Sequence, residues 1–235
     1  MLKICGISDM HGILDFNIKK CDILCICGDI VPLDIQNYHK PTFKWLKNVF
    51  IPWCQNQPCE KVLLVGGNHD IKIADHEQEL RSLLVDTKIT YLLDEECTII
   101  DNEGNEFKFY GSPWCHIFGN WAFMISDESI AEKLSNMPND VDVLLTHDAP
   151  YGTSDILLQD VYWATKQHIG SKPLRDAVID KQPRLMLKGH LHSCNQDCEM
   201  LNKTNVYTVS VVDERYKRVY EPHYFELTKD SVSAV

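Results

Sequence analysis

The 235-residue sequence has no apolar run long enough to span a bilayer. Its first residues, MLKICGISDMHG, also lack the extended apolar region and the cleavage site of a signal peptide. No internal repeat, low-complexity tract or Gly/Ser/Pro-rich linker divides the chain. We therefore expect a cytoplasmic protein that starts directly with a strand and folds as a single domain over residues 1–235.

Positive charge is scarce, since 23 Lys and Arg residues face 34 Asp and Glu residues and leave a formal net charge of -11. Such a surface repels polyphosphates at long range, which disfavours non-specific binding of nucleic acids. Bound cations would reverse this repulsion locally, and the formal charge does not include them.

The ten cysteines contain no C-x-x-C pair, and Cys194 and Cys198 are four positions apart. Cys25 and Cys27 lie two apart in an apolar run, so on a strand they share one buried face. Without an export signal, this pattern predicts reduced thiols rather than disulfides or a structural zinc site.

Short apolar segments rich in Val, Ile and Leu are typical of strands buried on both faces. Five such segments occur, at residues 2–8, 22–31, 61–67, 141–147 and 184–190. Helices are predicted at residues 42–56, 75–85, 127–136 and 172–180. Residues 97–112 predict a hairpin, and residues 206–212 and 218–227 are strand-like again. The mixture indicates an α/β protein with mixed sheets.

Each of the five apolar segments ends in carboxylate, imidazole or amide groups. The sequences at these ends are Asp9-Met10-His11, Gly28-Asp29, Gly67-Asn68-His69-Asp70, Thr146-His147-Asp148 and Gly189-His190-Leu191-His192. In open α/β sheets, ligands bind in the crevice outside the carboxyl ends of the strands, so these groups are expected to converge. A solvated polar turn explains any one of them equally well, but it does not explain five in this order.

The residue types suit divalent cations, because carboxylates, imidazoles and an amide oxygen are donors for Mn, Fe, Zn or Ni. A two-metal site needs roughly six to eight donors. The chain offers seven, with His69 left over: Asp9, His11, Asp29, Asn68, His147, His190 and His192. The other five histidines are expected to be ordinary surface or packing residues: His39, His76, His116, His168 and His223.

The order D-M-H, G-D, G-N-H-D, T-H-D and G-H-L-H resembles the calcineurin-like metallophosphoesterase superfamily over residues 9–192. The resemblance implies a sandwich of two mixed β-sheets flanked by helices (αββα) and a dinuclear metal centre. It further implies that Asp9, His11 and His192 hold one ion. Asn68, His147 and His190 would hold the other, and Asp29 would bridge the two.

Within the superfamily, the chain is similar to the small single-domain phosphodiesterase-type branch through GSPWCHIFGNWAFMISDES and LLTHDAPYG. Two features distinguish the chain from the protein Ser/Thr phosphatases. It lacks their Asp-Arg-Gly continuation after the Gly-Asp motif, and its third motif ends in Asp70 where theirs ends in Glu. Relatives often have T-H-G-P-P where this chain has Thr146-His147-Asp148-Ala149-Pro150, so Asp148 departs from the pattern.

The resulting hypothesis is a metal-dependent phosphoesterase, foremost a phosphodiesterase that hydrolyses a small phosphoester, for example a cyclic nucleotide. A metal-bound hydroxide would attack phosphorus, with Mn²⁺ favoured for activity. His69 would protonate the leaving group, and Asp70 would either orient the His69 ring or cap a turn. The alternatives are a phosphomonoesterase or a nuclease on the same centre, or a non-catalytic metal-binding scaffold.

The aromatic segment 114–121 is expected near the substrate mouth, where Trp or Phe would stack on a base of a nucleotide ligand. The alternative is that its aromatic side chains pack this loop onto the core.

Overall fold

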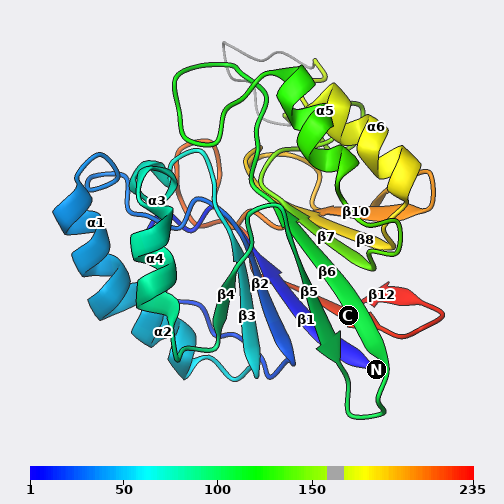
Figure 1. The fold of residues 1–235 in the computed structure, drawn as a ribbon, viewed down its shortest axis with the longest axis horizontal. Coiled ribbons are helices and arrows are strands. Elements are labelled where there is room, and N and C mark those ends of the chain that lie inside the picture. The colour runs from blue at the N-terminus through cyan, green and yellow to red at the C-terminus, as the bar shows by residue number, and fades with distance from the viewer. Residues whose placement is uncertain (158–166) are drawn as a thin grey trace.

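The computed structural model describes residues 1–157 and 167–235, in which the strands form two six-stranded sheets (Figure 1). The first sheet has the order β12-β11-β1-β2-β3-β4. Strands β1 to β4 are parallel, β11 pairs antiparallel with β1, and β12 pairs antiparallel with β11. The strands are β1 (Leu2–Ile7), β2 (Ile23–Cys27), β3 (Lys61–Val65), β4 (Ile89–Tyr91), β11 (His223–Leu227) and β12 (Val232–Ala234).

The second sheet has the order β5-β6-β7-β8-β10-β9, with four parallel strands in the middle and an antiparallel strand at each edge. Its edge strand β5 forms the predicted hairpin with β6. The strands are β5 (Glu95–Ile100), β6 (Glu106–Ser112), β7 (Val143–Thr146), β8 (Leu185–Lys188), β9 (Glu199–Leu201) and β10 (Thr204–Thr208).

The two sheets pack face to face around an apolar core. This core includes Ile4, Cys25 and Leu63 from the first sheet and Phe109 and Leu145 from the second, all fully buried. Both faces of the central strands are apolar because helices cover the outer face of each sheet. The predicted class, two mixed β-sheets flanked by helices, is therefore confirmed.

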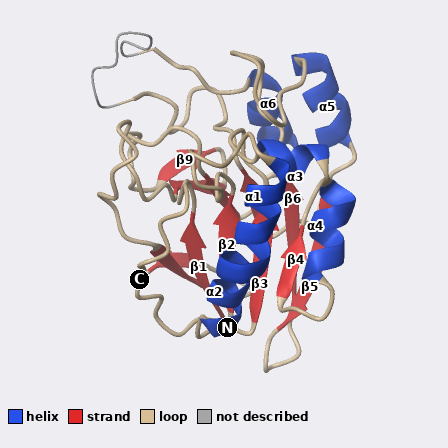
Figure 2. Ribbon diagram, turned by 90° about the vertical axis from the view of Figure 1, so that its left-hand side faces the viewer, coloured by secondary structure: helices blue, strands red, loops and turns tan. Residues whose placement is uncertain are grey.

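The helices form one layer on each side of the sandwich (Figures 1 and 2). The layer on the first sheet contains α1 (His39–Trp45), the π-helical turn η1 (Leu46–Phe50), α2 (Ile51–Asn56), α3 (Ile71–Asp75) and α4 (Glu77–Leu84). The layer on the second sheet contains α5 (Asp127–Ser135) and α6 (Lys172–Lys181). The hydroxyls of Ser126 and Ser171 cap α5 and α6 by accepting a backbone N–H three residues later.

The differences from the predicted elements lie in short segments. The helix expected at residues 42–56 begins three residues earlier and contains η1, while α3 and the three-residue strands β4, β9 and β12 were not anticipated. In the strand-like segment 218–227, only His223–Leu227 is a strand. All ten cysteines are free, as expected. In the described ranges, no helix combines the length and apolar character needed to cross a membrane.

The carboxyl ends of β1, β2 and β3 in one sheet and of β7 and β8 in the other meet at one end of the sandwich. Hydrogen bonds join the two sheets there, since His147 Nδ1 lies 2.7 Å from the Cys27 carbonyl oxygen and the His190 N–H donates to the Asp9 carboxylate. The loops that follow these five strands carry the residues singled out in the sequence.

Candidate metal centre

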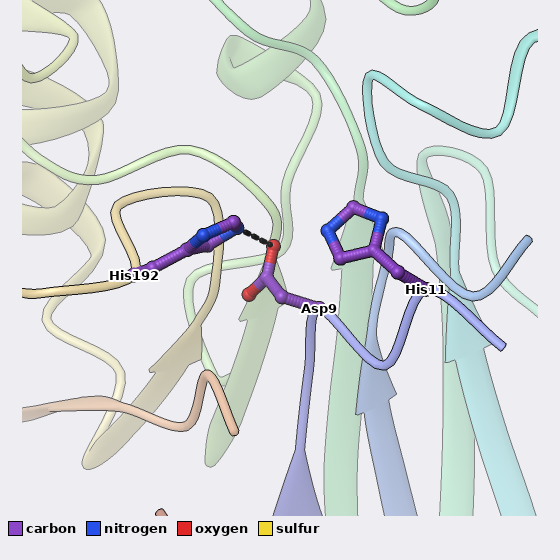
Figure 3. A group of neighbouring side chains, drawn as sticks. All are labelled: Asp9, His11 and His192. Atoms are coloured by element: carbon purple, nitrogen blue, oxygen red, sulfur yellow. Dashed lines mark ion pairs between the residues drawn. The ribbon is translucent and has the colours of Figure 1, made fainter. Parts of the chain in front are cut away.

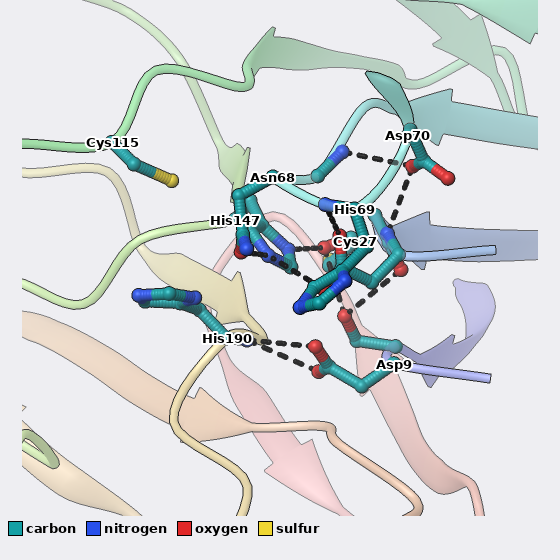
Figure 4. A network of polar contacts seen from close by, with 12 residues as sticks. Asp9, Cys27, Asn68, His69, Asp70, Cys115, His147 and His190 are labelled. Carbon is teal, nitrogen blue, oxygen red and sulfur yellow. Dashed lines mark hydrogen bonds and ion pairs between the residues drawn. The ribbon is translucent and has the colours of Figure 1, made fainter. Parts of the chain in front are cut away.

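Six of the seven predicted donors come together where these strands end (Figures 3 and 4). Two groups of three have donor atoms that all lie within 4.8 Å of one another: Asp9, His11 and His192, and Asp9, Asp29 and His147. Asn68 joins the second group, because its Oδ1 lies 2.9 Å from His147 Nε2. The loops after β1, β2, β3, β7 and β8 thus supply one cluster from both sheets.

Two histidines of the cluster are oriented by backbone carbonyls. His147 Nδ1 lies 2.7 Å from the Cys27 carbonyl oxygen, and His192 Nδ1 lies 3.0 Å from that of Asp213. When these Nδ1–H groups donate to the carbonyls, each Nε2 turns toward the carboxylates, at 3.4 Å from Asp29 Oδ2 and from Asp9 Oδ1. This arrangement is typical of metal-ligating histidines.

His11 is the clearest sign that the cluster fits a cation. Both of its ring nitrogens are buried without a hydrogen-bond partner among the described residues, and its Nε2 lies 3.8 Å from Asp29 Oδ2. A buried polar group without a partner costs about 1–3 kcal/mol. A metal ion at this position would satisfy a ring nitrogen of His11 and neutralise the carboxylates beside it.

The charges of the cluster also favour cations. Asp9 and Asp29 are fully buried, which opposes their ionisation, yet His192 and His147 hold the pKa values of these two carboxyls well below the usual range. Burial lowers the pKa of His147, but the Asp29 carboxylate outweighs this and raises it to about 10. Two ionised carboxylates in a buried site therefore attract positive charge from protons or metal ions.

The backbone of the cluster is held in an unfavourable conformation. Asp9, His11, Asp29 and His190 have positive φ angles, of 55°, 42°, 53° and 68°. Non-glycine residues in this region cost of order 1–3 kcal/mol each and are concentrated at functional sites. Gly67 packs so tightly against the cluster that a Cβ there would lie 2.2 Å from Asp29 Oδ1.

His190, the seventh predicted donor, is placed differently. Its backbone N–H donates to both Asp9 carboxylate oxygens at 3.1 Å, while its ring is turned toward Phe118, with 5.0 Å between the ring centroids. The His147 ring is 5.1 Å away. The imidazole of His190 thus lies at the edge of the cluster (Figure 4).

His69 lies beside the cluster rather than in it. Its backbone N–H donates to Asp29 Oδ1 at 2.7 Å, and its Nδ1 lies 2.8 Å from Gln36 Oε1. The rings of Trp121 and His11 lie 4.6 and 5.1 Å from the His69 ring, between centroids. Burial lowers the pKa of His69.

The expectation that Asp70 orients the His69 ring is wrong, because Gln36 occupies that position. The two oxygens of Asp70 instead accept backbone N–H groups of Asp29, Ile30, Val31 and Gly67 at 2.9–3.1 Å. Burial and the charge of Asp29 raise the pKa of Asp70 to about 7, against the lowering effect of the Gly67 and Val31 N–H groups. Asp70 therefore fixes the loops after β2 and β3, which is closer to the turn-capping alternative.

Asp148 has a partner that the sequence did not indicate. Its carboxylate is fully buried and accepts the backbone N–H groups of His116 and Ala149, and Oδ2 lies 2.7 Å from His116 Nδ1. The hydrogen bond to Asp148 raises the pKa of His116, although burial opposes this. Asp148 thereby ties the aromatic segment 114–121 to the loop after β7.

A cavity of about 920 Å³ opens beside the cluster. Its lining includes Asp29, Asn68, His69, His190, His192 and the aromatic residues Phe118, Trp121, Tyr151 and Tyr216. His116 and His168, which were expected to be ordinary surface or packing residues, also line it, and His168 is exposed whereas His116 is partly buried. The aromatic side chains of segment 114–121 have different positions. Trp114 packs on the core, whereas Phe118 and Trp121 line the cavity.

Curated proteins with similar sequences include one that is named for a metallophosphoesterase domain. Metallophosphoesterase domain-containing protein 1 of Homo sapiens is 28% identical over 214 residues, which cover 79% of this chain and 59% of that protein. UPF0046 protein T07D4.2 of Caenorhabditis elegans is 25% identical over 249 residues, covering 86% and 58%. The chain thus spans less than two thirds of the length of these relatives.

Solved structures share the fold at low sequence identity. TT1561 of Thermus thermophilus superposes with a TM-score of 0.58 at 13% identity, over 88% of both chains. Phosphopantetheinyl hydrolase (PptH) from Mycobacterium tuberculosis gives a TM-score of 0.55 at 15% identity, over 91% of this chain and 90% of that one. The profile of the calcineurin-like phosphoesterase family matches residues 2–194, and the chain belongs to this family.

Proposed function

We propose that the protein is a phosphodiesterase that hydrolyses a small phosphoester, such as a cyclic nucleotide. It would use two divalent cations, and Mn²⁺ would support activity best. In this proposal Asp29 would be shared by the two ions. Asp9, His11 and His192 would hold one ion, and Asn68, His147 and His190 would hold the other. For this role the His190 ring would have to turn away from Phe118.

The observation that carries the proposal is the unsatisfied His11 ring beside two buried carboxylates. Packing alone gives no reason to bury both of these nitrogens without a partner. A cation supplies the missing partner and the missing charge together. The same feature argues against a scaffold that has lost its ligands.

Two divalent cations bound here would neutralise phosphoester oxygens and lower the pKa of a water molecule, which makes hydrolysis feasible at neutral pH. The remaining task is a proton for the leaving oxygen, and we assign it to His69. Gln36 fixes the His69 ring through Nδ1, so Nε2 is the atom that delivers the proton. Asp70 contributes by holding the loop that carries Asp29.

The cavity suits a substrate of nucleotide size. Its volume of about 920 Å³ is within the usual range of about 300–1,000 Å³ for ligand pockets. The exposed rings of Phe118 and Trp121 offer flat surfaces on which a base can stack. The formal charge of -11 disfavours long nucleic acids, which supports a small substrate.

Hydrolysis assays with Mn²⁺ test the proposal on a chromogenic diester, a chromogenic monoester and single-stranded DNA. Asp29→Ala serves as the blank, because it removes the bridging carboxylate. We expect Asp29-dependent turnover that is fastest with the diester. Faster monoester or DNA hydrolysis would identify a phosphomonoesterase or a nuclease instead, and equal rates in wild type and Asp29→Ala would leave a non-catalytic scaffold.

We further propose that residues 1–235 act as one unit and work in the cytoplasm. The ten free thiols, most of them buried, fit a reducing compartment.

A further inference from the structure

A third cluster of ligand-type side chains lies on the helical layer of the first sheet and shares no residue with the candidate metal centre. It consists of His39, the first residue of α1, His76, between α3 and α4, and Glu79, in the first turn of α4. One donor atom from each of the three lies within 4.8 Å of the other two. The His39 and His76 rings are 4.2 Å apart between centroids, and His39 Nε2 lies 2.7 Å from Glu79 Oε2.

We propose that His39, His76 and Glu79 form a separate binding site for a divalent transition-metal ion of the zinc type. Two imidazoles and one carboxylate, with water in the fourth position, make an open tetrahedral zinc site. Zn–N and Zn–O bonds of about 2.0–2.2 Å place the donors about 3.3 Å apart in a tetrahedron. The structure already brings the three donor atoms within 4.8 Å of one another, and side-chain rotation would bring them to that separation.

The backbone supports this geometry on two sides. His76 and Glu79 share one helical turn, because the Glu79 N–H donates to the His76 carbonyl at 3.1 Å. His76 is the N-cap residue of α4, with φ -134° and ψ 45°, and one donor atom of its ring lies within 4.8 Å of the Glu79 carboxylate. The His39 ring packs against Phe43, one turn further along α1, at 4.9 Å between centroids. The start of α1, the N-cap residue of α4 and the first turn of α4 therefore supply one donor each.

An ordinary surface ion pair between His39 and Glu79 explains part of the cluster but not all of it. The two side chains are 39% and 46% exposed, and pairs with such exposure contribute little to stability. Such a pair also gives no role to His76, whose ring lies beside that of His39. The same exposure allows an ion to enter and leaves room for a water ligand.

Metal counting on the full-length chain without an affinity tag tests the site. The wild type, His76→Gln and Glu79→Gln are equilibrated with excess Zn²⁺, passed through a desalting column, and analysed for zinc per chain. Glu77→Gln is the matched control, because Glu77 lies in the same helical turn but faces Arg81, with 2.7 Å between Oε1 and Nε. We expect His76→Gln and Glu79→Gln each to lose one zinc per chain relative to the wild type and Glu77→Gln.

A second measurement locates the ion directly. Substoichiometric Cu²⁺ added to the isotope-labelled protein should broaden the backbone NMR signals of residues 38–44 and 74–80, and His76→Gln should abolish this broadening. Equal zinc content in all four proteins, or broadening that survives in His76→Gln, would overturn the proposal. Neither readout depends on hydrolysis, so failure of the proposed phosphodiesterase activity would be seen separately.

Discussion

His69 is the residue on which the proposed chemistry depends most. Its backbone N–H donates to Asp29 and its ring is held by Gln36, so we assign its side chain no ligand role. We expect His69→Ala to keep its metal content and to lose about 10²–10⁴-fold in kcat on an alkyl phosphodiester, the usual contribution of a positioned general acid. Metal analysis and steady-state kinetics on the same preparation check both parts.

The leaving group provides the internal control for His69. A diester with a very acidic leaving group needs little protonation, so His69→Ala should retain most of its rate there. Asp29→Ala is the contrasting variant, because it should lose metal as well as turnover on both substrates. Wild-type rates of His69→Ala on the alkyl diester would refute the assignment.

Gly67 is a residue at which even the smallest side chain should damage the metal centre. A methyl group at this position would meet Asp29 Oδ1 at 2.2 Å and His147 Cε1 at 2.7 Å, and neither side chain can retreat from its buried position. We expect Gly67→Ala to bind less metal and to lose activity with it. Gly104→Ala is the control for removing a glycine away from the centre, in the turn between β5 and β6. A Cβ there meets no described residue within 4 Å, and the φ of 82° strains only that turn. Unchanged metal content in Gly67→Ala would show that the cluster tolerates displacement of Asp29.

Single residues also mark the limit of what sequence patterns reveal. The candidate donors could be singled out because each follows a recognisable buried strand. Gln36 and His116 could not, because neither belongs to such a motif. Gln36 reaches His69 across 33 positions of sequence and His116 reaches Asp148 across 32. The sequence did show that Asp148 departs from the motif of its relatives. It did not show that His116 is the partner of Asp148, because the two residues meet only in the folded structure.

At the scale of elements, the loops after β2 and β3 depend on one buried carboxylate. The Asp70 carboxylate accepts hydrogen bonds from four backbone N–H groups. The substitution Asp70→Ala would remove this acceptor from all four buried donors. Since an unsatisfied buried group costs about 1–3 kcal/mol, we expect a loss of at least about 3 kcal/mol in the free energy of unfolding. Urea denaturation monitored by circular dichroism measures it.

The control for Asp70 lies in the next helix. Asp75 pairs with Lys72 on the surface of α3, so Asp75→Ala should change the free energy of unfolding by less than about 0.5 kcal/mol. Asp70→Asn keeps one acceptor oxygen and should fall between the two. Equal stability of Asp70→Ala and Asp75→Ala would contradict the role given to Asp70.

Elements were predictable in proportion to their length and burial. The buried runs and the capped helices α5 and α6 carry strong periodic or capping signals. The strands β4, β9 and β12 have three residues each, too few for an alternating pattern. These segments are strands because a neighbouring strand pairs with them, as β3 pairs with β4. Such pairing depends on the assembled sheet and cannot be recognised in the short segment itself.

At the scale of the molecule, the candidate centre joins the two sheets. Asp9 and Asp29 follow strands of the first sheet, whereas His147 and His192 follow strands of the second. Ions bound here would therefore connect the halves of the sandwich and stabilise the whole fold by mass action. At a free ion concentration 100-fold above Kd, the stabilisation is about 2.7 kcal/mol for each site. For a chain of this size, that amounts to about 5–10 °C in Tm per site.

Metal removal should consequently lower the melting temperature of the protein. We expect a chelator to lower Tm by at least about 5 °C and added Mn²⁺ to restore it, as measured by differential scanning calorimetry. The experiment is best done with His76→Gln, so that an ion at His39 and Glu79 cannot contribute to the shift. Asp29→Ala in the same background should melt at one temperature with or without chelator. If chelation left Tm unchanged in the His76→Gln protein, the buried donors would form a cluster that is stable without ions, and the two-metal proposal would fail.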